Sequence, residues 1–561
     1  MTEQLIDAAD PAAERWVEAT LAELGLRERI AQLILAWIPG GEIPAGTDRF
    51  ERLIRWIESD QVGGLIVSRG PVDEFAPFLN QLQARSRVPL LIVSDLETGP
   101  GMRLTGGTNM PPAMAFAAAG NLELARQAGL ASAREGRAAG IHLTLGPVLD
   151  VNSNPYNPII NTRSFGEDPR RVAEMASAWI EGARSGGLQV AGKHFPGHGA
   201  TEVDSHVGLP TISSSVAELH ETELVPFRVA IQQGMDGVLV GHIAVPAIDG
   251  PAAPPASLSP AIVSDLLRRQ LGFEGLIITD ALNMGAIVNH YGVPEASILA
   301  LQAGADLLLQ PPDHGEVIDA IAEAVRRGRL SEERITESVR RVLTAKVKAG
   351  LHRNRFAPGG AAEPAHQRIA AEVIASAITL VKDDRELVPI PADATRIVHV
   401  TFSLPGNPFS GSTLATALLS AGHPVETVRM GPGTQRGEYE VARLAAQAAD
   451  LTLVSISMSP RQSQGALDLP PAFIRFVEGL STAGVPMVTI SFGTPYVLGS
   501  LPGVPTQLLA WTADPQAQEA VAAALLGQAP VQGRLPVSLP PEHKIGSGIP
   551  RPAQLGESGS S

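Results

Sequence analysis

Side chains that can move protons gather in one short stretch of the chain. Residues 192–210 read GKHFPGHGATEVDSHVGLP and contain three histidines, one lysine and one aspartate. Asp204 and His206 are separated by a single serine, so the carboxylate can orient the imidazole and support its protonated form. A histidine held in this way takes up and releases protons near neutral pH, which predicts a general acid/base dyad.

Two other interpretations of residues 192–210 are open. Histidines bind metal ions, but a zincin-type site needs them on one face of a helix, and Pro196 and Gly197 argue against a helix here. A polar loop without any catalytic role is the second alternative, because surface loops accept histidine at little cost. The combination of residue types favours catalysis without a metal ion.

A second candidate for chemistry is Asp280, which ends the apolar run 276–279 (LIIT) and precedes ALNMGAI. An aspartate at the end of a strand that faces a pocket can act as a nucleophile or as an electrostatic stabiliser. The alternative is a structural role as the N-cap of the segment that follows, since aspartate is a preferred N-cap residue.

A repeated unit positions these residues: a short apolar run rich in β-branched residues, then a segment with helical spacing. Runs this apolar indicate strands that are buried on both faces, as in parallel sheets. Helical segments such as 121–139 and 168–186 lie between them. Eight such units in about 300 residues predict an α/β fold of the (β/α)₈ TIM-barrel type. The runs are 33–38, 62–68, 89–95, 141–147, 189–195, 237–242, 275–280 and 305–310.

In a barrel of this kind the active site lies at the carboxyl ends of the strands. A ring of carboxylate, histidine and lysine side chains at those positions predicts a polar catalytic pocket. The residues at the expected strand ends are Asp95, Asp150 just beyond Pro147, Lys193 and His194, His242, Asp280 and Gln310.

The chain of 561 residues is predicted to contain two domains. We expect the barrel at 15–350, with a closing helix at 331–349, and a Gly- and Pro-containing linker at 351–365. A second strand–helix series at 366–545 predicts an α/β sandwich domain with a mostly parallel sheet, and 546–561 predicts a flexible tail. The expected strands of the second domain are 396–402, 424–429, 451–457, 485–492 and 506–511, and its expected helices are 412–421, 438–449 and 515–527.

Composition excludes several classes of function. The net charge of −15 argues against a nucleic-acid-binding surface, and the absence of cysteine excludes disulfides and thiolate metal sites. The N-terminus has no basic segment followed by an apolar core, and no apolar stretch is long enough to span a membrane, so we expect a cytoplasmic protein. The run 104–112 (LTGGTNMPP) lacks the following helix of a phosphate-binding loop, so we expect no nucleotide or other cofactor.

The sequence resembles the bacterial β-N-acetylglucosaminidases of glycoside hydrolase family 3. The motifs that carry the resemblance are KHFPGHG followed by DSH, ITDALNMGA at 278–286 and RSFGEDP at 163–169. It continues at 24–35, 154–169, 377–390 and 533–540, which look like the family's entry helix, a barrel loop, and the start and end of its second domain. The resemblance implies exo-acting, retaining removal of terminal β-linked N-acetylglucosamine from muropeptide or chitin-derived oligosaccharides, without a cofactor.

The resemblance also assigns roles to individual residues. Asp280 matches the nucleophile, and His206, oriented by Asp204, matches the general acid/base. Residues that match contacts to the sugar are Asp95, Arg103, Arg163, Lys193 and His194. The family usually has a Glu-Gly-Gly-Arg type of stretch after the strand-end aspartate. Here Pro100 and Met102 interrupt that pattern, which predicts a reshaped loop around Arg103 and an altered substrate preference.

Three alternatives to hydrolysis of N-acetylglucosaminides stay open. A histidine acid/base repels anions less than a carboxylate does, so phosphate could replace water, as in a phosphorylase. A family 3 β-glucosidase or β-xylosidase would take its acid from a glutamate elsewhere, but Glu438 and Glu440 lie in a segment expected to be helical. An inactive sugar-binding protein would be expected to have lost Asp280, His206 or Asp204, and all three are present. Oligomeric state cannot be inferred from these features.

Overall fold

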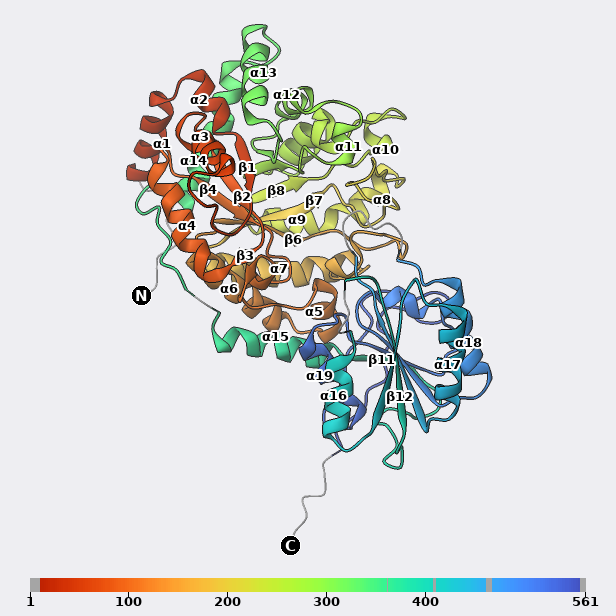
Figure 1. Ribbon diagram of the computed structural model, residues 1–561. Helices are drawn as coiled ribbons and strands as arrows, with labels where there is room; N and C mark the ends of the chain where they lie inside the picture. Colours follow the sequence, from red (N-terminus) through yellow and green to blue (C-terminus); the bar gives the residue numbers. More distant parts are fainter. Residues whose placement is uncertain (1–10, 361, 407–409, 461–466, 555–561) are drawn as a thin grey trace. The chain divides into compact units, whose positions relative to one another are not determined.

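The computed structural model describes residues 11–360, 362–406, 410–460 and 467–554 (Figure 1). The chain forms two compact units. The first takes in Met1–Met110, Ala125–Val151 and Val172–Gln367, and the second takes in Pro111–Leu124, Asn152–Arg171 and Arg368–Ser561. Two stretches inside the range expected for the barrel, 111–124 and 152–171, therefore belong with the second unit. The expected limits of the two domains remain a prediction.

The first unit is a barrel of eight parallel strands, as predicted. The strands follow one another in the order β10-β1-β2-β4-β6-β7-β8-β9. A parallel bridge between Ile278 and Leu307, with Thr279 N–H donating to Leu307 O at 3.0 Å, joins the two ends of this series. The strands are β1 (Ile34–Ile38), β2 (Gly64–Val67), β4 (Leu91–Ser94), β6 (Leu143–Val148), β7 (Gln189–Phe195), β8 (Gly237–Val240), β9 (Leu276–Thr279) and β10 (Leu308–Leu309).

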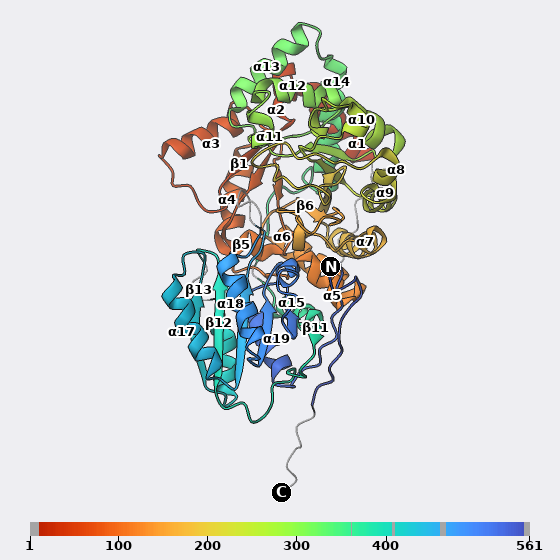
Figure 2. The same ribbon diagram turned by 90° about the vertical axis from the view of Figure 1, so that its right-hand side faces the viewer.

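Helices cover the outside of the barrel, and several begin where the sequence provides a cap. Ser331 Oγ accepts from Arg334 N–H at 3.1 Å and starts α14 (Glu332–Lys348), which confirms the helix expected at 331–349. The terminal helix α1 (Pro11–Glu23) lies beside α14 (Figure 2). Other helices of the barrel region are α3 (Asp48–Glu58), α4 (Val72–Arg85), α6 (Leu122–Ala138), α7 (Pro169–Ser185), α9 (Leu224–Gln232), α11 (Gly285–Val288), α12 (Val293–Ala303) and α13 (His314–Arg326).

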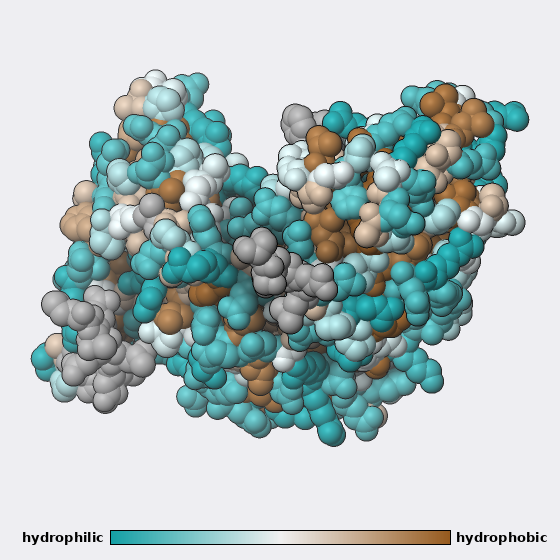
Figure 3. Space-filling model, turned by 90° about the horizontal axis from the view of Figure 1, so that it is seen from below, coloured by the Kyte–Doolittle hydropathy of each residue, from teal (hydrophilic) through white to brown (hydrophobic). Residues whose placement is uncertain are grey.

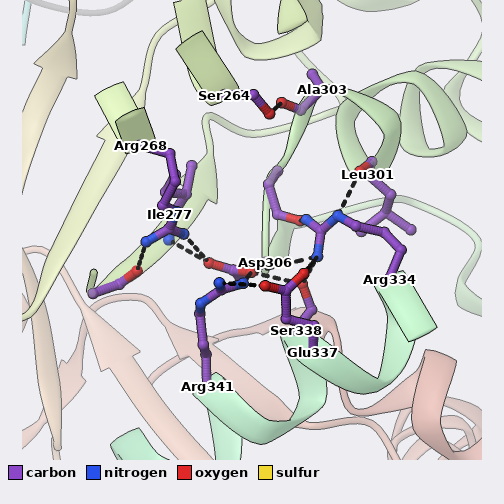
Figure 4. A network of polar contacts seen from close by, with 12 residues as sticks. Ser264, Arg268, Ile277, Leu301, Ala303, Asp306, Arg334, Glu337, Ser338 and Arg341 are labelled. Carbon is purple, nitrogen blue, oxygen red and sulfur yellow. Dashed lines mark hydrogen bonds and ion pairs between the residues drawn. The ribbon is translucent and has the colours of Figure 1, made fainter. Parts of the chain in front are cut away.

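A buried carboxylate fastens the amino-terminal end of β10 to the surrounding helices (Figure 4). Asp306 has no exposed surface, and its oxygens accept from Arg268 at 2.8 Å, Arg341 at 3.1 Å and Ser338 Oγ at 2.6 Å. The Ile277 N–H adds a bond of 3.1 Å from the neighbouring strand β9. This end of a barrel serves stability rather than catalysis, so the network positions the strands that carry Asp280 and Gln310 at their other ends.

Lys346 on α14 is also fully buried, and its lowered pKa predicts a pH dependence of the protein's stability. Its Nζ donates to Gln32 Oε1 at 2.6 Å, and burial together with nearby Arg355 lowers its pKa to about 7. Between pH 7 and 10 the unfolded chain therefore binds more protons than the folded one, so stability rises with pH, by roughly 1.4 kcal/mol per pH unit for one such group. Lys346→Met should remove this rise, measured as thermal unfolding from pH 7 to 9.5. Lys348→Met, at an exposed position of the same helix, should keep it, and parallel curves for wild type and Lys346→Met would contradict the prediction.

The second unit contains a six-stranded sheet in the order β11-β16-β15-β14-β12-β13. Five strands were predicted and pair in parallel: β12 (Ile397–Ser403), β13 (Val425–Met430), β14 (Leu451–Ser457), β15 (Met487–Ser491) and β16 (Thr506–Leu509). The sixth, β11 (Thr379–Asp383), was not predicted and runs antiparallel to β16. Helices α16 (Ser412–Ser420) and α19 (Pro515–Leu525) pack on one face, and α17 (Arg436–Gln447) and α18 (Pro471–Thr482) pack on the other (Figure 1).

Residues 546–554, the first part of the flexible tail expected at 546–561, make defined contacts with the second unit. Ile549 N–H donates to Leu380 O at 2.7 Å, Arg551 pairs with Val531, and the Arg551 guanidinium reaches the buried Asp383 at 2.8 Å. These residues therefore lie against β11 and Val531, and the flexibility of the tail remains a prediction. Residues 461–466 belong to the segment 459–470, which follows the expected strand 451–457 and is a candidate ligand contact or, more simply, a loop; they and residues 555–561 fall outside the described residues.

Hydrophobic residues on the face drawn in Figure 3 form separate patches among hydrophilic ones. Within the described ranges, no helix has the length and apolar character needed to cross a membrane. Exposed large apolar side chains include Leu419, Val441 and Leu444 in the second unit and Trp37, Val203 and Val207 in the barrel.

Candidate active site

Four charged side chains meet at the carboxyl ends of β4 and β7. Lys193 Nζ lies 2.8 Å from Asp95 Oδ1 and 2.5 Å from Glu97 Oε1, and Arg103 Nη2 lies 2.6 Å from Asp95 Oδ2. Burial disfavours the charge on Asp95, but Lys193 and Arg103 outweigh it and hold the pKa of Asp95 below its ordinary value. Asp95 is therefore an ionised acceptor between two cations, which suits adjacent sugar hydroxyls.

Arg103 reaches this cluster although its loop departs from the usual family pattern. Pro100–Met102 forms a single turn of 3₁₀ helix, and Gly99 adopts a positive φ of 74°, where a side chain would meet Met110 and Thr108. Arg103 follows this turn and still reaches Asp95, so Pro100 and Met102 do not keep the arginine from the cluster, and an altered substrate preference remains a prediction.

Glu97 is a member of this cluster that the sequence did not single out. We expect Glu97→Gln to weaken the hold on Lys193 and to raise KM about tenfold while kcat changes less, because a charged hydrogen bond of this kind contributes roughly 1.5–3 kcal/mol. Steady-state kinetics on an N-acetylglucosaminide test this. Glu202→Gln, at an exposed position of the 192–210 loop, is the matched control. An unchanged KM in Glu97→Gln would show that Asp95 alone positions Lys193.

A second buried carboxylate organises the start of the 192–210 loop. Asp150 Oδ2 lies 2.7 Å from His194 Nδ1, and Oδ1 accepts from the backbone N–H groups of His194 at 3.1 Å and His198 at 2.7 Å. Burial opposes its charge, but the two histidines lower the pKa of Asp150 below the ordinary value. An ionised Asp150 fixes the orientation of the His194 ring at the pocket.

The structure brings Asp204 and His206 together as the sequence predicted. His206 Nδ1 lies 2.6 Å from Asp204 Oδ1, which also accepts from the His206 backbone N–H at 2.9 Å. The Asp204 side chain is buried, whereas a quarter of the His206 side chain is exposed. A carboxylate bonded to Nδ1 leaves Nε2 to exchange protons with a bound molecule, which is the arrangement that acid/base catalysis requires.

Asp280 directly follows β9 and interacts electrostatically with nearby histidines. Burial disfavours its charge, but His242, His194 and His206, with the Ala281 N–H at 2.8 Å, hold the pKa of Asp280 below its ordinary value. The group is therefore a carboxylate at neutral pH, as a nucleophile must be. The alternative N-cap role is wrong, because the helix that follows, α11, begins at Gly285 with Met284 as its N-cap.

The loop that carries the dyad rests on the segment that follows Asp280. Ala286 N–H donates to Ser205 O at 3.4 Å, and a Cβ on Gly285 would lie 2.8 Å from His206 O. Only glycine allows this close approach. The motif ALNMGA thus couples the position of His206 to that of Asp280.

His242, noted among the strand ends, has a defined place beside Asp280. It is fully buried, with Nδ1 2.7 Å from Ser257 Oγ and Nε2 3.1 Å from Ala281 O. Burial lowers the pKa of His242, and because a carbonyl oxygen only accepts, the ring donates from Nε2 to the Ala281 carbonyl. His242 therefore holds the backbone directly after the candidate nucleophile.

Arg163 is the one predicted sugar contact that the structure assigns to the second compact unit. It ends the 3₁₀ helix Asn161–Arg163 and donates to Ile159 O at 3.0 Å. Its contact with a sugar remains a prediction.

The three histidines of the 192–210 loop each have a partner of their own. His194 pairs with Asp150, His206 with Asp204, and His198 lies 2.6 Å from Thr201 Oγ1 and 3.1 Å from Ser205 Oγ. Across the part of the chain that the structure describes, no group of three or more metal-binding side chains is arranged to hold an ion. The contacts favour the catalytic interpretation of the loop over the metal site.

The fold and the strand-end carboxylates are those of a two-domain glycoside hydrolase, and comparison with known proteins agrees. Residues 25–345 match the glycosyl hydrolase family 3 N-terminal domain, and residues 298–555 match the family 3 C-terminal domain. The chain therefore belongs to glycoside hydrolase family 3.

Individual relatives extend over nearly the whole chain. A protein of Cellulomonas fimi named beta-N-acetylglucosaminidase/beta-glucosidase is 32% identical, over 93% of this chain and 95% of its own length. The solved family 3 beta-N-acetylglucosaminidase of Paenibacillus sp. FPU-7 is 32% identical with a TM-score of 0.81, over 92% of this chain and 99% of that one. The solved beta-glucoside phosphorylase BglX is 27% identical with a TM-score of 0.84, over 94% and 97%.

Proposed function

We propose that this protein is a retaining, exo-acting β-N-acetylglucosaminidase that removes terminal β-linked N-acetylglucosamine by hydrolysis. The observation that carries the proposal is the pairing of an ionised Asp280 with the Asp204–His206 dyad, whose loop packs on the segment after Asp280. The names of the Cellulomonas and Paenibacillus relatives support the choice of sugar.

The reaction is a double displacement. Asp280 attacks the anomeric carbon, the bond from that carbon to the leaving oxygen breaks, and His206 gives its Nε2 proton to that oxygen. Water then attacks the glycosyl ester, His206 takes the proton from the water, and Asp280 leaves as a carboxylate. Asp204 stabilises the imidazolium form of His206 that each cycle requires.

The remaining side chains hold the sugar. The ionised Asp95, flanked by Lys193 and Arg103, accepts two neighbouring hydroxyls, and His194 donates or accepts at a third position. Arg163 supplies a further contact, as the family resemblance implies. This mechanism needs no metal ion or cofactor, because the acid, the base and the nucleophile are all side chains.

Phosphorolysis is a second candidate with a specific observation in its favour. The acid/base is a histidine rather than a carboxylate, so a phosphate anion approaching the anomeric carbon meets less repulsion. The relative BglX, named as a beta-glucoside phosphorylase, is similar over both domains. In that case phosphate would attack the glycosyl ester and the product would be the sugar 1-phosphate.

Release of nitrophenol from the β-N-acetylglucosaminide and the β-glucoside of p-nitrophenol, with and without phosphate, tests the proposal. Free N-acetylglucosamine at a rate independent of phosphate is the expected result. Sugar 1-phosphate would identify a phosphorylase, and preference for the glucoside would identify a β-glucosidase. Turnover of neither would support an inactive sugar-binding protein. Muropeptide and chitin fragments both end in N-acetylglucosamine, and either is a natural substrate that this pocket would accept.

A further inference from the structure

A buried glutamate outside the proposed site is bonded to the loop that carries Arg103. Glu135 lies on α6, and only 5% of it is exposed. One of its oxygens accepts from the Thr108 N–H at 2.9 Å, and the other accepts from Thr108 Oγ1 at 2.6 Å and lies 2.7 Å from His366 Nδ1. Thr108 and His366 are buried as well. Polar groups that are removed from water in this way keep their partners, so the three side chains hold one another in place.

Thr108 is joined in turn to the 3₁₀ turn that precedes Arg103. Its carbonyl oxygen accepts from the Gly101 N–H at 2.8 Å. A Cβ on Gly99 would lie only 2.8 Å from the same oxygen, so the two sides of the loop touch without room for a side chain between them. A displacement of Thr108 would therefore displace the turn.

The orientation of the Arg103 side chain depends on this turn. Arg103 N–H donates to Pro100 O at 2.9 Å, and its Nη2 lies 2.6 Å from Asp95 Oδ2. Its Nε is buried and has no hydrogen-bond partner among the described residues. The backbone that carries Arg103 therefore helps Asp95 to fix the guanidinium, and a small shift of that backbone would misplace it.

We propose that Glu135 and Thr108 are positioning residues for sugar binding, which hold the turn before Arg103 so that Arg103 and Asp95 meet the sugar hydroxyls in one geometry. His366, in the first turn of α15 (Pro364–Ala377), keeps Glu135 in place. The inference rests on the proposed function, because Asp95 and Arg103 serve this purpose only in a pocket that takes a sugar.

Thr108→Val tests the proposal, because it keeps the shape of the side chain and the backbone N–H but removes the hydroxyl. We expect KM for p-nitrophenyl β-N-acetylglucosaminide to rise about 3- to 10-fold, with kcat changed less than about twofold. Thr108→Ser should restore the wild-type KM. The matched control is Ser132→Ala on the same helix, since Ser132 is equally buried but donates to Ala128 O within α6; it should leave KM unchanged.

A double-mutant cycle with Arg103→Ala separates positioning from general loosening of the fold. Once the guanidinium is gone, Thr108→Val has nothing left to misplace and should change KM by less than about twofold. The same fold-change in both backgrounds, or an unchanged KM in Thr108→Val alone, would overturn the proposal. Thr108→Val is preferred to Glu135→Ala, because loss of the glutamate would leave two buried partners unsatisfied and endanger folding.

Calorimetry with N-acetylglucosamine keeps this inference apart from the proposed function, because binding of the monosaccharide needs no turnover. Thr108→Val should raise its Kd by the same factor as KM. Thr108-dependent binding in a wild type that releases no sugar would reject the hydrolase and retain the positioning role. Hydrolysis by a wild type whose KM and Kd do not respond to Thr108→Val would do the reverse, and absence of both binding and turnover would overturn both.

Discussion

Asp280→Ala should lower kcat on p-nitrophenyl β-N-acetylglucosaminide by about 10⁴-fold or more, the scale of loss when a nucleophile is removed from an enzyme with a covalent intermediate. Asp280 is the carboxylate that His242, His194 and His206 keep ionised, and without it no glycosyl ester forms. Steady-state and stopped assays of nitrophenol release measure the fall in kcat. KM should change far less than kcat.

Added azide distinguishes loss of a nucleophile from loss of the pocket. In Asp280→Ala the small anion fits where the carboxylate was and attacks the same face of the sugar in a single displacement. The α-glycosyl azide should form and part of the rate should return. Asp319→Ala, at an exposed aspartate on the barrel surface, is the control and should keep wild-type kcat. A fall of less than tenfold in Asp280→Ala would falsify the assignment of the nucleophile.

Much of the barrel could be predicted because its strands are continuous apolar runs. LIIT before Asp280 and LIVS before Asp95 are buried at every position, so each run marks both a strand and the residue at its end. The Asp204–His206 contact could also be predicted, because two side chains separated by one residue in a turn have little freedom to lie apart. The strand β11 was missed because it lies at the edge of the sheet, where pairing depends on the distant β16.

Contacts between residues that lie far apart in the chain could not be predicted from the sequence. Glu97 joins the sugar-binding cluster only because Lys193, 96 positions further along the chain, lies at the end of another strand (193 − 97 = 96). The membership of 152–171 in the second unit likewise depends on partners such as Ser538, whose N–H donates to Glu167 at 2.8 Å.

His206→Ala should produce the second large effect, and its size should depend on the leaving group. General acid catalysis contributes roughly 10²- to 10⁴-fold, and it matters most when the leaving oxygen is basic. We therefore expect a fall of about 10³-fold on N,N′-diacetylchitobiose and a much smaller fall in the first step for a dinitrophenyl glycoside, which needs no proton. Asp204→Asn should act in the same direction but less, because the ring remains while its orientation and its charged form lose support.

The leaving-group dependence separates an acid from a residue that only shapes the pocket. His290→Ala, at an exposed histidine after α11, should leave both substrates unaffected. If His206→Ala slows the first step of both glycosides by the same factor, His206 holds the pocket open and another group donates the proton. Because Gly285 presses against the His206 carbonyl, such a result would direct attention to the loop after Asp280, where displacement of the backbone would harm every substrate alike.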